Sequence, residues 1–379
     1  MIIKNVKVYT EDKTFQEGQI AVEDGRIVAM EEMTEEGKAE VIDGKGAYAI
    51  PGLIDLHFHG CMGQDVCDGT MEALETIAKY EASIGVTAIA PATMTLPVEE
   101  LEAVLRNAAQ FQKTQTEGAD FLGLNMEGPF ISPVKKGAQD ERNILPCDVE
   151  LLKRFMEASD GLVKFMGLAP EESADFKEFI EAVKDQVHIS LAHTNSDYDT
   201  AMEAFAAGAD HAVHLFNAMP AFTHRDPGVI GAVFDSKHVK AEIICDGVHI
   251  HPSMVRAAFQ MMGADRMILI SDSMRATGMP DGRYTLGGLD VDVKGNRATL
   301  VSDGALAGSV TNLMECMKTV VKQMDIPLTD AVACATMNPA KQLGVYDQYG
   351  SISVGKKANI VLLDENLELI QVIKDGEML

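Results

Sequence analysis

The sequence predicts an α/β fold: a (β/α)8 barrel of the TIM type with a small β-sandwich domain formed by both termini. Through the middle of the chain, short β-rich segments alternate eight times with helix-like segments. Both ends instead carry short strand-like runs separated by turns. Neither a Gly-x-Gly-x-x-Gly motif nor a Walker phosphate-binding loop follows any expected strand, which favours the barrel over a doubly wound open sheet, the remaining alternative.

The two ends of the chain have the pattern of short antiparallel strands. At the amino end we expect Ile3–Tyr9, Gln19–Glu23 and Arg26–Met30, with a hairpin turn at Asp24-Gly25. At the carboxyl end we expect Ser351–Val354, Asn359–Leu363 and Ile370–Ile373, then a turn at Asp375-Gly376. Neither group is large enough to form a stable sheet alone. Residues 1–50 and 346–379 are therefore predicted to form one β-sandwich domain together.

Residues 51–345 are predicted to form the barrel domain, which carries the catalytic site. Its expected strands are Leu53–His59, Thr87–Thr93, Phe121–Glu127, Val163–Ala169, His188–Thr194, Ala212–Asn217, Ala241–Asp246 and Met267–Asp272. Its helix-like segments include Met71–Ser83, Val98–Gln115, Phe176–Lys184 and Thr200–Ala207. After the eighth strand, the stretch from about Asp281 to Val301 is predicted to form inserted hairpins. Active sites of such barrels lie at the carboxyl ends of the strands.

Composition and charge exclude several classes of function. The chain of 379 residues has a formal net charge of −26 at pH 7, whereas nucleic-acid binding needs a basic surface. No apolar run reaches membrane-spanning length, and Met1 leads directly into a strand pattern rather than a signal peptide. Six cysteines without Cys-x-x-Cys pairs indicate reduced thiols. We therefore expect a cytoplasmic protein that binds neither nucleic acid nor membrane, and whose anion sites are built locally.

Histidine and acidic residues lie at the ends of successive expected strands. His57 and His59 end the first strand, where residues two apart point to the same side. Buried imidazoles cost desolvation free energy unless a partner such as a transition metal binds them. Later strands end in Glu127, His193, His214 and Asp272. Imidazole and carboxylate suit a divalent metal of the zinc or iron type, with Asp272 either binding the metal or transferring protons.

Nearly the whole chain resembles the amidohydrolase superfamily. The stretch Pro51–Gly60 is similar to the first-strand signature of that superfamily, and the strand-like termini resemble its split β-sandwich. Finer motifs resemble the N-acetylglucosamine-6-phosphate deacetylase family. They are Asn125–Phe130, Lys136–Ala138, His214–Met219, Asp246–His249, Gly278–Gly282 and Leu306–Ser309.

The resemblance implies a metal-dependent hydrolysis of an acetamide. Glu127, His193 and His214 match the ligands of the principal metal, and Glu127 stands where many relatives carry a carboxylated lysine. His57 and His59 would hold a second metal that Glu127 bridges. The cofactor is thus expected to be one or two divalent ions per chain, zinc, iron, cobalt or manganese. Asp272 would accept the proton of the activated water and deliver it to the amide nitrogen.

The resemblance also implies a phosphorylated amino sugar as substrate, in amino-sugar catabolism or cell-wall recycling. Asn217 and Ala218 match residues whose backbone N–H groups bind the phosphate, and His249 matches a substrate-binding histidine. Arg225 matches an arginine that reaches the phosphate from a neighbouring subunit, which implies a homodimer. The remaining residues expected beside the substrate are Ala138, Gln139, Leu306 and Ala307.

Two places depart from the family pattern. Gln139 stands where many relatives carry a histidine that helps hold the acetyl carbonyl, and glutamine can donate a hydrogen bond but cannot titrate. Ser273–Thr277 is bulkier than the expected run of small residues, so Arg275 touches either the substrate or solvent. Two alternatives to the deacetylase remain: another amidohydrolase acting on a different amide, and an inactive scaffold, which the complete set of ligand positions disfavours. His211 receives no role.

Overall fold

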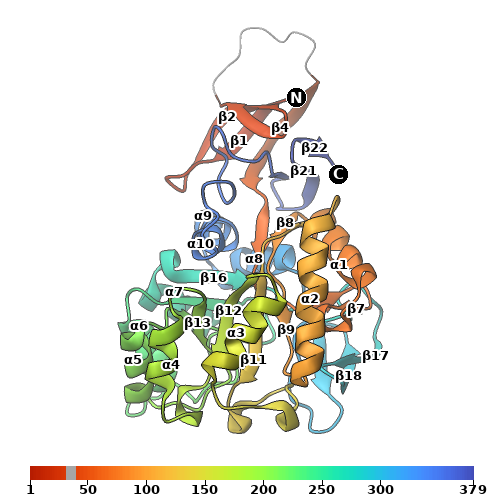
Figure 1. Cartoon of the computed structure of the whole chain (residues 1–379). Helices are drawn as coiled ribbons and strands as arrows, with labels where there is room; N and C mark the ends of the chain where they lie inside the picture. The colour runs from red at the N-terminus through yellow and green to blue at the C-terminus, as the bar shows by residue number, and fades with distance from the viewer. Residues whose placement is uncertain (31–39) are drawn as a thin grey trace.

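Both termini of the chain meet in one mixed β-sheet (Figure 1). The computed structural model of the protein describes residues 1–30 and 40–379. The seven strands of this sheet follow the order β22-β21-β20-β4-β1-β2-β3. They are β1 (Ile2–Tyr9), β2 (Phe15–Glu23), β3 (Arg26–Ala29), β4 (Val41–Pro51), β20 (Ile360–Leu363), β21 (Leu369–Lys374) and β22 (Glu377–Met378). β4 joins the two ends, because it pairs parallel to β1 and antiparallel to β20.

The terminal sheet has an apolar core of its own. Its buried members include Ile3, Val8, Ile20 and Ile360, so burial as well as strand pairing unites the two ends of the chain. The expected turns at residues 24–25 and 375–376 are present. The expected strand Ser351–Val354 is wrong, because this segment is irregular. The Ser351 hydroxyl donates to Glu11 Oε1 at 3.0 Å, a side-chain bond of the kind that competes with a strand ladder.

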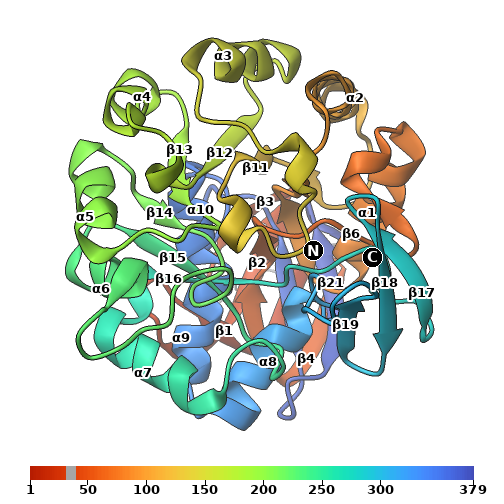
Figure 2. The ribbon, with the colours of Figure 1, turned by 90° about the horizontal axis from the view of Figure 1, so that it is seen from below.

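Parallel strands in the middle of the chain form two sheets that curl around a common axis (Figure 2). The strand orders are β10-β8-β5 and β16-β15-β14-β13-β12-β11-β9. The strands are β5 (Leu53–Asp55), β8 (Val86–Ile89), β9 (Ala92–Thr93), β10 (Asp120–Phe121), β11 (Leu124–Phe130), β12 (Val163–Leu168), β13 (His188–Leu191), β14 (His211–Ala212), β15 (Lys240–Ile244) and β16 (Met267–Ile270). All the strands expected in this region are found, although two of them are interrupted and several end earlier than predicted.

The segments that follow β5 and β16 are hydrogen-bonded to each other. The Asp272 amide donates to the His57 carbonyl at 3.0 Å, and the His59 amide donates to the Ser273 carbonyl at 2.7 Å. These bonds bring the end of the first strand against the end of the last one. The histidine pair and Asp272 therefore lie side by side.

Helices surround the parallel strands on the outside (Figure 2). The α-helices are α1 (Met71–Ser83), α2 (Val98–Thr114), α3 (Val149–Ala158), α4 (Phe176–Val183), α5 (Tyr198–Ala207), α6 (Gly228–Asp235), α7 (Pro252–Met262), α8 (Leu313–Met324), α9 (Leu328–Ala335) and α10 (Met337–Gln342). The 3-10 helices are η1 (Val66–Asp68), η2 (Pro133–Lys135), η3 (Glu141–Asn143), η4 (Pro170–Glu172) and η5 (Ala264–Arg266). In α1, the Thr70 hydroxyl caps the first turn, and Leu74 and Ile77 face the core.

Short antiparallel strands interrupt this alternation at two places. β17 (Gly282–Leu286), β18 (Leu289–Lys294) and β19 (Arg297–Leu300) form a three-stranded antiparallel sheet, as the sequence predicts for residues 281–301. β6 (Gly60–Cys61) and β7 (Gln64–Asp65) form a small hairpin after the histidine pair. The buried cluster beneath the three-stranded sheet includes Met94, Ala138, Leu286 and Ala307. This insert therefore packs against loops that follow the carboxyl ends of the parallel strands.

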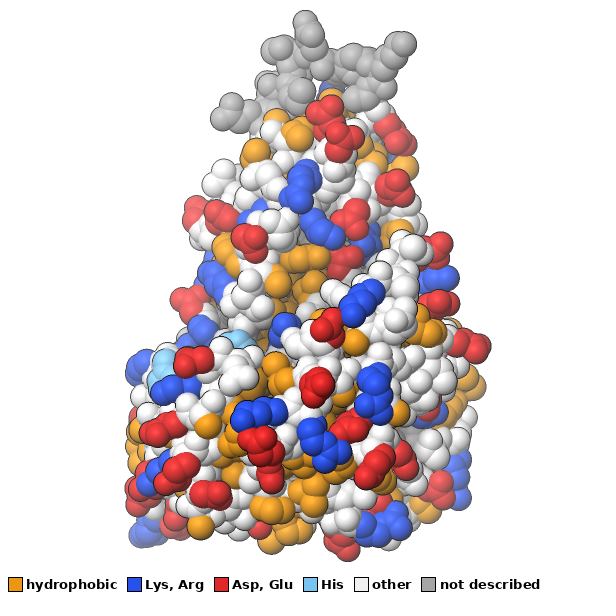
Figure 3. All heavy atoms as spheres, viewed as in Figure 1, with side chains coloured by type: hydrophobic (Ala, Val, Ile, Leu, Met, Phe, Trp, Pro, Cys, Tyr) orange, Lys and Arg blue, Asp and Glu red, His pale blue; other side chains and the backbone are white. Residues whose placement is uncertain are grey.

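Acidic and basic side chains are intermixed on the face of the molecule shown in Figure 3. The net charge of −26 is thus not gathered into one acidic patch on this face. None of the helices in the described parts of the chain combines the length and the apolar character that crossing a membrane requires.

Candidate metal and active site

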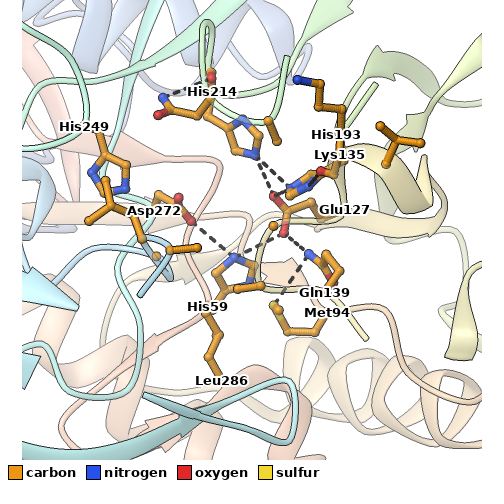
Figure 4. A pocket seen from close by; sticks show the side chains of 18 residues that line it. His59, Met94, Glu127, Lys135, Gln139, His193, His214, His249, Asp272 and Leu286 are labelled. Atoms are coloured by element: carbon orange, nitrogen blue, oxygen red, sulfur yellow. Dashed lines mark hydrogen bonds and ion pairs between the residues drawn. The ribbon is translucent and has the colours of Figure 1, made fainter. Parts of the chain in front are cut away.

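The five predicted metal ligands converge at the carboxyl ends of the parallel strands, and Figure 4 shows four of them. Glu127 lies within β11, whose residues are all buried. His57 and His59 follow β5, His193 follows β13, and His214 follows β14. Each strand therefore ends just before its ligand, or contains it, and the parallel arrangement gathers side chains that are far apart in the sequence.

Glu127 forms one compact cluster with two histidines. Its Oε1 atom lies 3.0 Å from His193 Nε2 and 2.9 Å from His214 Nε2. The two Nε2 atoms are 3.1 Å apart. All three side chains are buried. The ligand atoms of this group lie within 4.8 Å of one another, a spacing that suits a single metal ion.

The same carboxylate also belongs to a second cluster. His57 Nε2 lies 3.4 Å from Glu127 Oε1, and His59 Nε2 lies 3.4 Å from Glu127 Oε2. These ligand atoms also lie within 4.8 Å of one another. Glu127 thus stands between two pairs of histidines and belongs to both groups that could hold a metal ion.

Hydrogen bonds on the far side of the rings determine which nitrogen faces the cluster. His59 Nδ1 donates to the Ala92 carbonyl at 3.2 Å, and His193 Nδ1 donates to the Lys135 carbonyl at 2.9 Å. Because a carbonyl only accepts, these Nδ1 atoms carry the proton, and in a neutral ring Nε2 presents a lone pair. Lone pairs aimed at the Glu127 carboxylate repel it unless a cation lies between them. The buried site therefore fits a divalent metal.

Asp272 lies beside the second cluster. Its Oδ1 atom is 3.3 Å from His59 Nε2 and 3.9 Å from His57 Nε2, and it accepts no hydrogen bond within the described residues. The backbone φ of Asp272 is +50°, and that of His193 is +44°, a left-handed conformation that costs free energy in residues other than glycine. Strain at these positions aims both side chains into the site.

Without a metal ion, histidines that carry a proton keep the two central carboxylates ionised, and a bound cation would act in the same direction. Burial raises the pKa of Glu127, but the neighbouring His193 and His57 lower it further, so that it falls well below its ordinary value. Burial also raises the pKa of Asp272, and its interactions with His59 and His57 more than offset this effect. Both shifts favour the ionised carboxylate, the form that a metal ligand or a proton acceptor needs.

A cavity of about 370 Å³ opens above these groups. Six of the predicted substrate-binding residues line it, namely Ala138, Gln139, Asn217, Ala218, His249 and Leu306. Ala307 is fully buried beside the wall and is not part of the lining. Arg225 is also absent from the lining: it is exposed on the loop after β14, where its Nη1 atom contacts His224 Nε2 at 2.6 Å. One chain therefore brings together all the predicted residues except these two.

Gln139 is fixed by both ends of its side-chain amide. Its Nε2 atom donates to Glu127 Oε2 at 2.6 Å, and its Oε1 atom accepts from the Thr95 amide at 2.7 Å. Gln139 thus touches a metal ligand as well as the cavity. Arg275 donates to Asp68 Oδ1 at 2.8 Å and ties two loops together away from the cavity lining.

The backbone groups expected to bind phosphate differ in availability. The Asn217 amide already donates to the His214 carbonyl at 2.9 Å, whereas the Ala218 amide has no acceptor within the described residues. Ala218 has a φ of +52°, which belongs to a tight turn next to the cavity. Across the cavity, His249 Nδ1 lies 2.7 Å from Asp246 Oδ2. Burial lowers the pKa of His249, but the Asp246 carboxylate raises it above its ordinary value.

Several residues near the site have no counterpart among the predictions. Met94, Lys135 and Leu286 line the cavity. Met94 follows the second expected strand and Lys135 precedes the Lys-Gly-Ala motif, and these positions were the only signals available. Beneath the ligands, Glu242 of β15 contacts His57 Nδ1 at 2.7 Å and His211 Nε2 at 2.9 Å. An acidic residue inside an apolar strand was its signal in the sequence.

Comparison with known proteins agrees with this geometry. The amidohydrolase family profile matches residues 48–379 of the chain. The N-acetylglucosamine-6-phosphate deacetylase of Bacillus subtilis (strain 168) is 37% identical over 384 residues, which cover 100% of this chain and 96% of that protein. The N-acetylgalactosamine-6-phosphate deacetylase of Escherichia coli O157:H7 is 32% identical, over 100% of this chain and 98% of that protein.

Solved structures show the same likeness. An alanine mutant of the N-acetyl-D-glucosamine-6-phosphate deacetylase of Mycobacterium smegmatis, in complex with N-acetyl-D-glucosamine 6-phosphate, superposes with a TM-score of 0.93. Its sequence identity is 29%, and the match covers 100% of this chain and 98% of that one. Similarity therefore extends over the terminal sheet as well as the parallel strands.

Proposed function

The chain belongs to the amidohydrolase family, and we propose that it hydrolyses the acetamide of N-acetyl-D-glucosamine 6-phosphate to D-glucosamine 6-phosphate and acetate. One observation carries this proposal: Glu127, His193, His214 and Asp272 meet at the floor of a single cavity. Relatives that match the whole chain bear the name of this activity.

The metal ligands follow from the two clusters. Glu127, His193 and His214 would hold the principal ion, and His57 and His59 would hold a second ion that Glu127 bridges. The chemistry that such an ion would supply is polarisation of the amide carbonyl and a lowering of the pKa of a water molecule to roughly 7. Imidazole and carboxylate accept zinc, iron, cobalt or manganese, so the donor set does not select among these ions.

Asp272 is the proton-transfer group of the proposed reaction. Its ionised carboxylate accepts the proton of the attacking water and later delivers that proton to the departing nitrogen. Its Oδ1 atom is buried beside His59 and His57 and accepts no hydrogen bond within the described residues, so its lone pairs remain for a water molecule held at the metal ligands. The positive φ of Asp272 holds the carboxylate at this place.

Substrate recognition uses the wall of the cavity. We place the sugar between Leu306 and His249, with the acetyl group towards Gln139 and the metal ligands. The Ala218 amide and His249 then face the phosphate, because the former has a free N–H group and the latter has a raised pKa. These groups build an anion site locally within a strongly acidic protein.

Arg225 completes the phosphate site across a homodimer in this proposal. Among the described residues of a single chain, its guanidinium contacts His224 and does not line the cavity above the metal ligands. An exposed loop that follows a strand bearing a metal ligand is well placed to extend into a second copy of the chain. The fork of an arginine can donate two parallel hydrogen bonds to a phosphate.

The fold fits this assignment when the two parallel sheets are taken as one closed (β/α)8 barrel. We assign residues 51–345 to the barrel, and residues 1–50 and 346–379 to a sandwich that the terminal sheet forms by folding over its own core. The hydrogen bonds between the segments after β5 and β16 support closure. The proposed place of action is the cytoplasm, in amino-sugar catabolism or cell-wall recycling.

N-acetyl-D-galactosamine 6-phosphate is a second candidate substrate. It is favoured by the Escherichia coli O157:H7 relative, a deacetylase of that sugar phosphate that matches the chain along its whole length. The two sugars differ only in the configuration at C4, which carries neither the acetamide nor the phosphate. The same catalytic residues therefore serve either substrate.

The proposal is tested by measuring acetate release by protein whose metal content per chain has been determined. Protein of known metal content is assayed with N-acetylglucosamine 6-phosphate, N-acetylgalactosamine 6-phosphate and N-acetylglucosamine. We expect strong preference for a phosphorylated sugar, and the ratio between the first two identifies the substrate. Metal-loaded protein that releases no acetate from any of the three would contradict the proposed function while leaving family membership intact.

A further inference from the structure

A buried carboxylate lies directly beneath the metal ligands and has no role in the reaction described above. Glu242 stands in the middle of β15 and is fully buried. Its Oε2 atom lies 2.7 Å from His57 Nδ1 and accepts from the His214 amide at 3.1 Å. One oxygen of Glu242 therefore contacts a ligand of each cluster, His57 by its ring and His214 by its backbone.

The other oxygen of Glu242 is fixed by the neighbouring strands. Its Oε1 atom accepts from His211 Nε2 at 2.9 Å and from Asn125 Nδ2 at 3.4 Å. Asn125 also donates to the Leu56 carbonyl at 3.1 Å, next to His57 in the chain. Donors from three different strand segments thus hold the carboxylate in one orientation.

This contact determines how His57 faces the site. With its Nδ1–H donated to Glu242, a neutral His57 presents Nε2 to Glu127 at 3.4 Å, and that nitrogen has no hydrogen bond within the described residues. A carboxylate behind an imidazole fixes the tautomer and ring orientation of a metal ligand and increases its basicity. His59 has only a carbonyl behind it, so His57 is the more strongly supported ligand of its pair.

The number of buried carboxylates also supports a second metal ion at this site. Glu127, Asp272 and Glu242 are all buried, and within the described chain their ion pairs involve histidines only, without lysine or arginine. Three carboxylates carry more negative charge than one divalent ion balances. A buried charge without compensation is costly, so the third carboxylate favours binding of a second ion.

We propose that Glu242 is the positioning residue of the second metal: it holds His57 as a ligand and supplies the charge that this ion balances. This inference rests on the proposed second metal site. The competing explanation is purely structural, with Glu242 holding three strands together and a protonated histidine balancing its charge. The two explanations differ in what happens to each metal when the charge is removed.

Metal counting on matched variants tests the proposal. Wild-type protein, Glu242→Gln and Glu81→Gln are stripped with a chelator, reloaded with Zn²⁺ alone and analysed for zinc per chain and for both dissociation constants by chelator competition. Glu81 is the control, because it is a buried glutamate of α1 whose carboxylate accepts no hydrogen bond in the described chain. We expect two ions in wild type and Glu81→Gln. In Glu242→Gln, the dissociation constant of the more weakly bound ion should rise by about 10–100-fold. The dissociation constant of the more tightly bound ion should not change.

A double-mutant cycle shows whether Glu242 acts through His57. If it does, adding Glu242→Gln to His57→Gln should change the zinc content no further. Thermal unfolding of the metal-free proteins checks folding. If Glu242→Gln does not fold, Glu242→Asp takes its place, since its shorter side chain keeps the charge but loses the reach to His57 and should show the same selective loss.

Three results would overturn the inference: a folded Glu242→Gln with two ions at wild-type affinity, equal weakening of both ions, or wild type that never binds a second ion. The last result would remove the second site as well. Two ions in wild type with selective loss in Glu242→Gln, but no acetate release by either protein, would support the positioning role and contradict the proposed function instead.

Discussion

The two ends of the parallel strands both carry carboxylates, but these charges are balanced differently. At the end near the terminal sheet, Asp120 of β10 forms 2.8 Å ion pairs with Lys357 and Lys374. At the opposite end, the ion pairs of Glu127 and Asp272 within the described residues involve histidine rings alone. A carboxylate paired with lysine is balanced by the chain itself. One that faces imidazole lone pairs is balanced when a cation binds, so the first kind serves folding and the second serves function.

Removing divalent metal should have the largest effect and should act at one end only. We expect chelated protein to lose acetate release almost completely, because only the imidazole-lined end depends on a cation. Circular dichroism should show the fold retained, since the lysine pairs of Asp120 are intact. Adding back zinc, iron, cobalt or manganese singly should restore activity and identify the working ion. Full activity of protein shown to be free of metal would break the comparison.

Replacing Asp272 should affect catalysis without affecting the principal metal. Asp272→Asn is expected to lower kcat on the order of 10² or more, because the proton acceptor is lost. Its content of the ion held by Glu127, His193 and His214 should not change. Steady-state kinetics and metal analysis of the same preparation check both expectations. Near-normal turnover would remove Asp272 from its proposed role.

Arg225 adds a third kind of charge, an exposed cation outside the cavity. Arg225→Ala should raise KM for the phosphorylated sugar by about 10-fold or more, since a hydrogen bond between charged groups contributes about 1.5–3 kcal/mol. KM for N-acetylglucosamine should hardly change. Arg256→Ala, which removes a partly exposed arginine of α7 paired with Asp325, is the matched control. An equal effect on both substrates would show that Arg225 does not bind the phosphate.

Asp120 should show the smallest effect, and only on stability. Asp120→Asn is expected to lower the free energy of unfolding by about 1–3 kcal/mol, between the values for exposed and buried pairs, and to leave kcat unchanged. Burial raises the pKa of Asp120, but Lys374 and Lys357 lower it below its ordinary value. A lowered pKa stabilises the fold above the unfolded-state value of about 3.9. The stabilisation is lost as the pH falls through the folded-state pKa.

Denaturant unfolding of wild type and Asp120→Asn between pH 3 and pH 7 measures this difference. The difference in the free energy of unfolding between the two proteins should be largest near neutral pH and should decrease below about pH 4. A gap that is independent of pH would mean that packing, rather than charge, makes the contribution of Asp120.

The catalytic end of the molecule could be predicted from sequence largely because of its periodicity. His57 and His59 are two residues apart, and Glu127, His193, His214 and Asp272 each stand at the end of a β-rich run. Parallel strands gather such ends, so a one-dimensional pattern predicted a three-dimensional cluster. The strand boundaries were less exact: β5 and β14 end before their histidines, because the backbone turns there to aim the side chains.

Residues that act through other residues were not predicted. Glu242 and His211 lie inside buried strands. Glu242 contacts His57, which is 185 residues away in the sequence, and His211, which is 31 residues away. No local pattern indicates such contacts. β4 was missed because its glycines and charged residues are not typical of a central strand. Arg225 stays a prediction, since its proposed partner lies in another copy of the chain.

The hydrogen bonds from the Asp272 amide to the His57 carbonyl and from the His59 amide to the Ser273 carbonyl also have a consequence for partly folded molecules. The residues of the proposed chemistry also form the backbone hydrogen bonds that join the first strand to the last one. If these hydrogen bonds break, Asp272 and the histidine pair separate in the same event. A molecule that is partly unfolded at this place is therefore inactive, so it does not hydrolyse other amides indiscriminately.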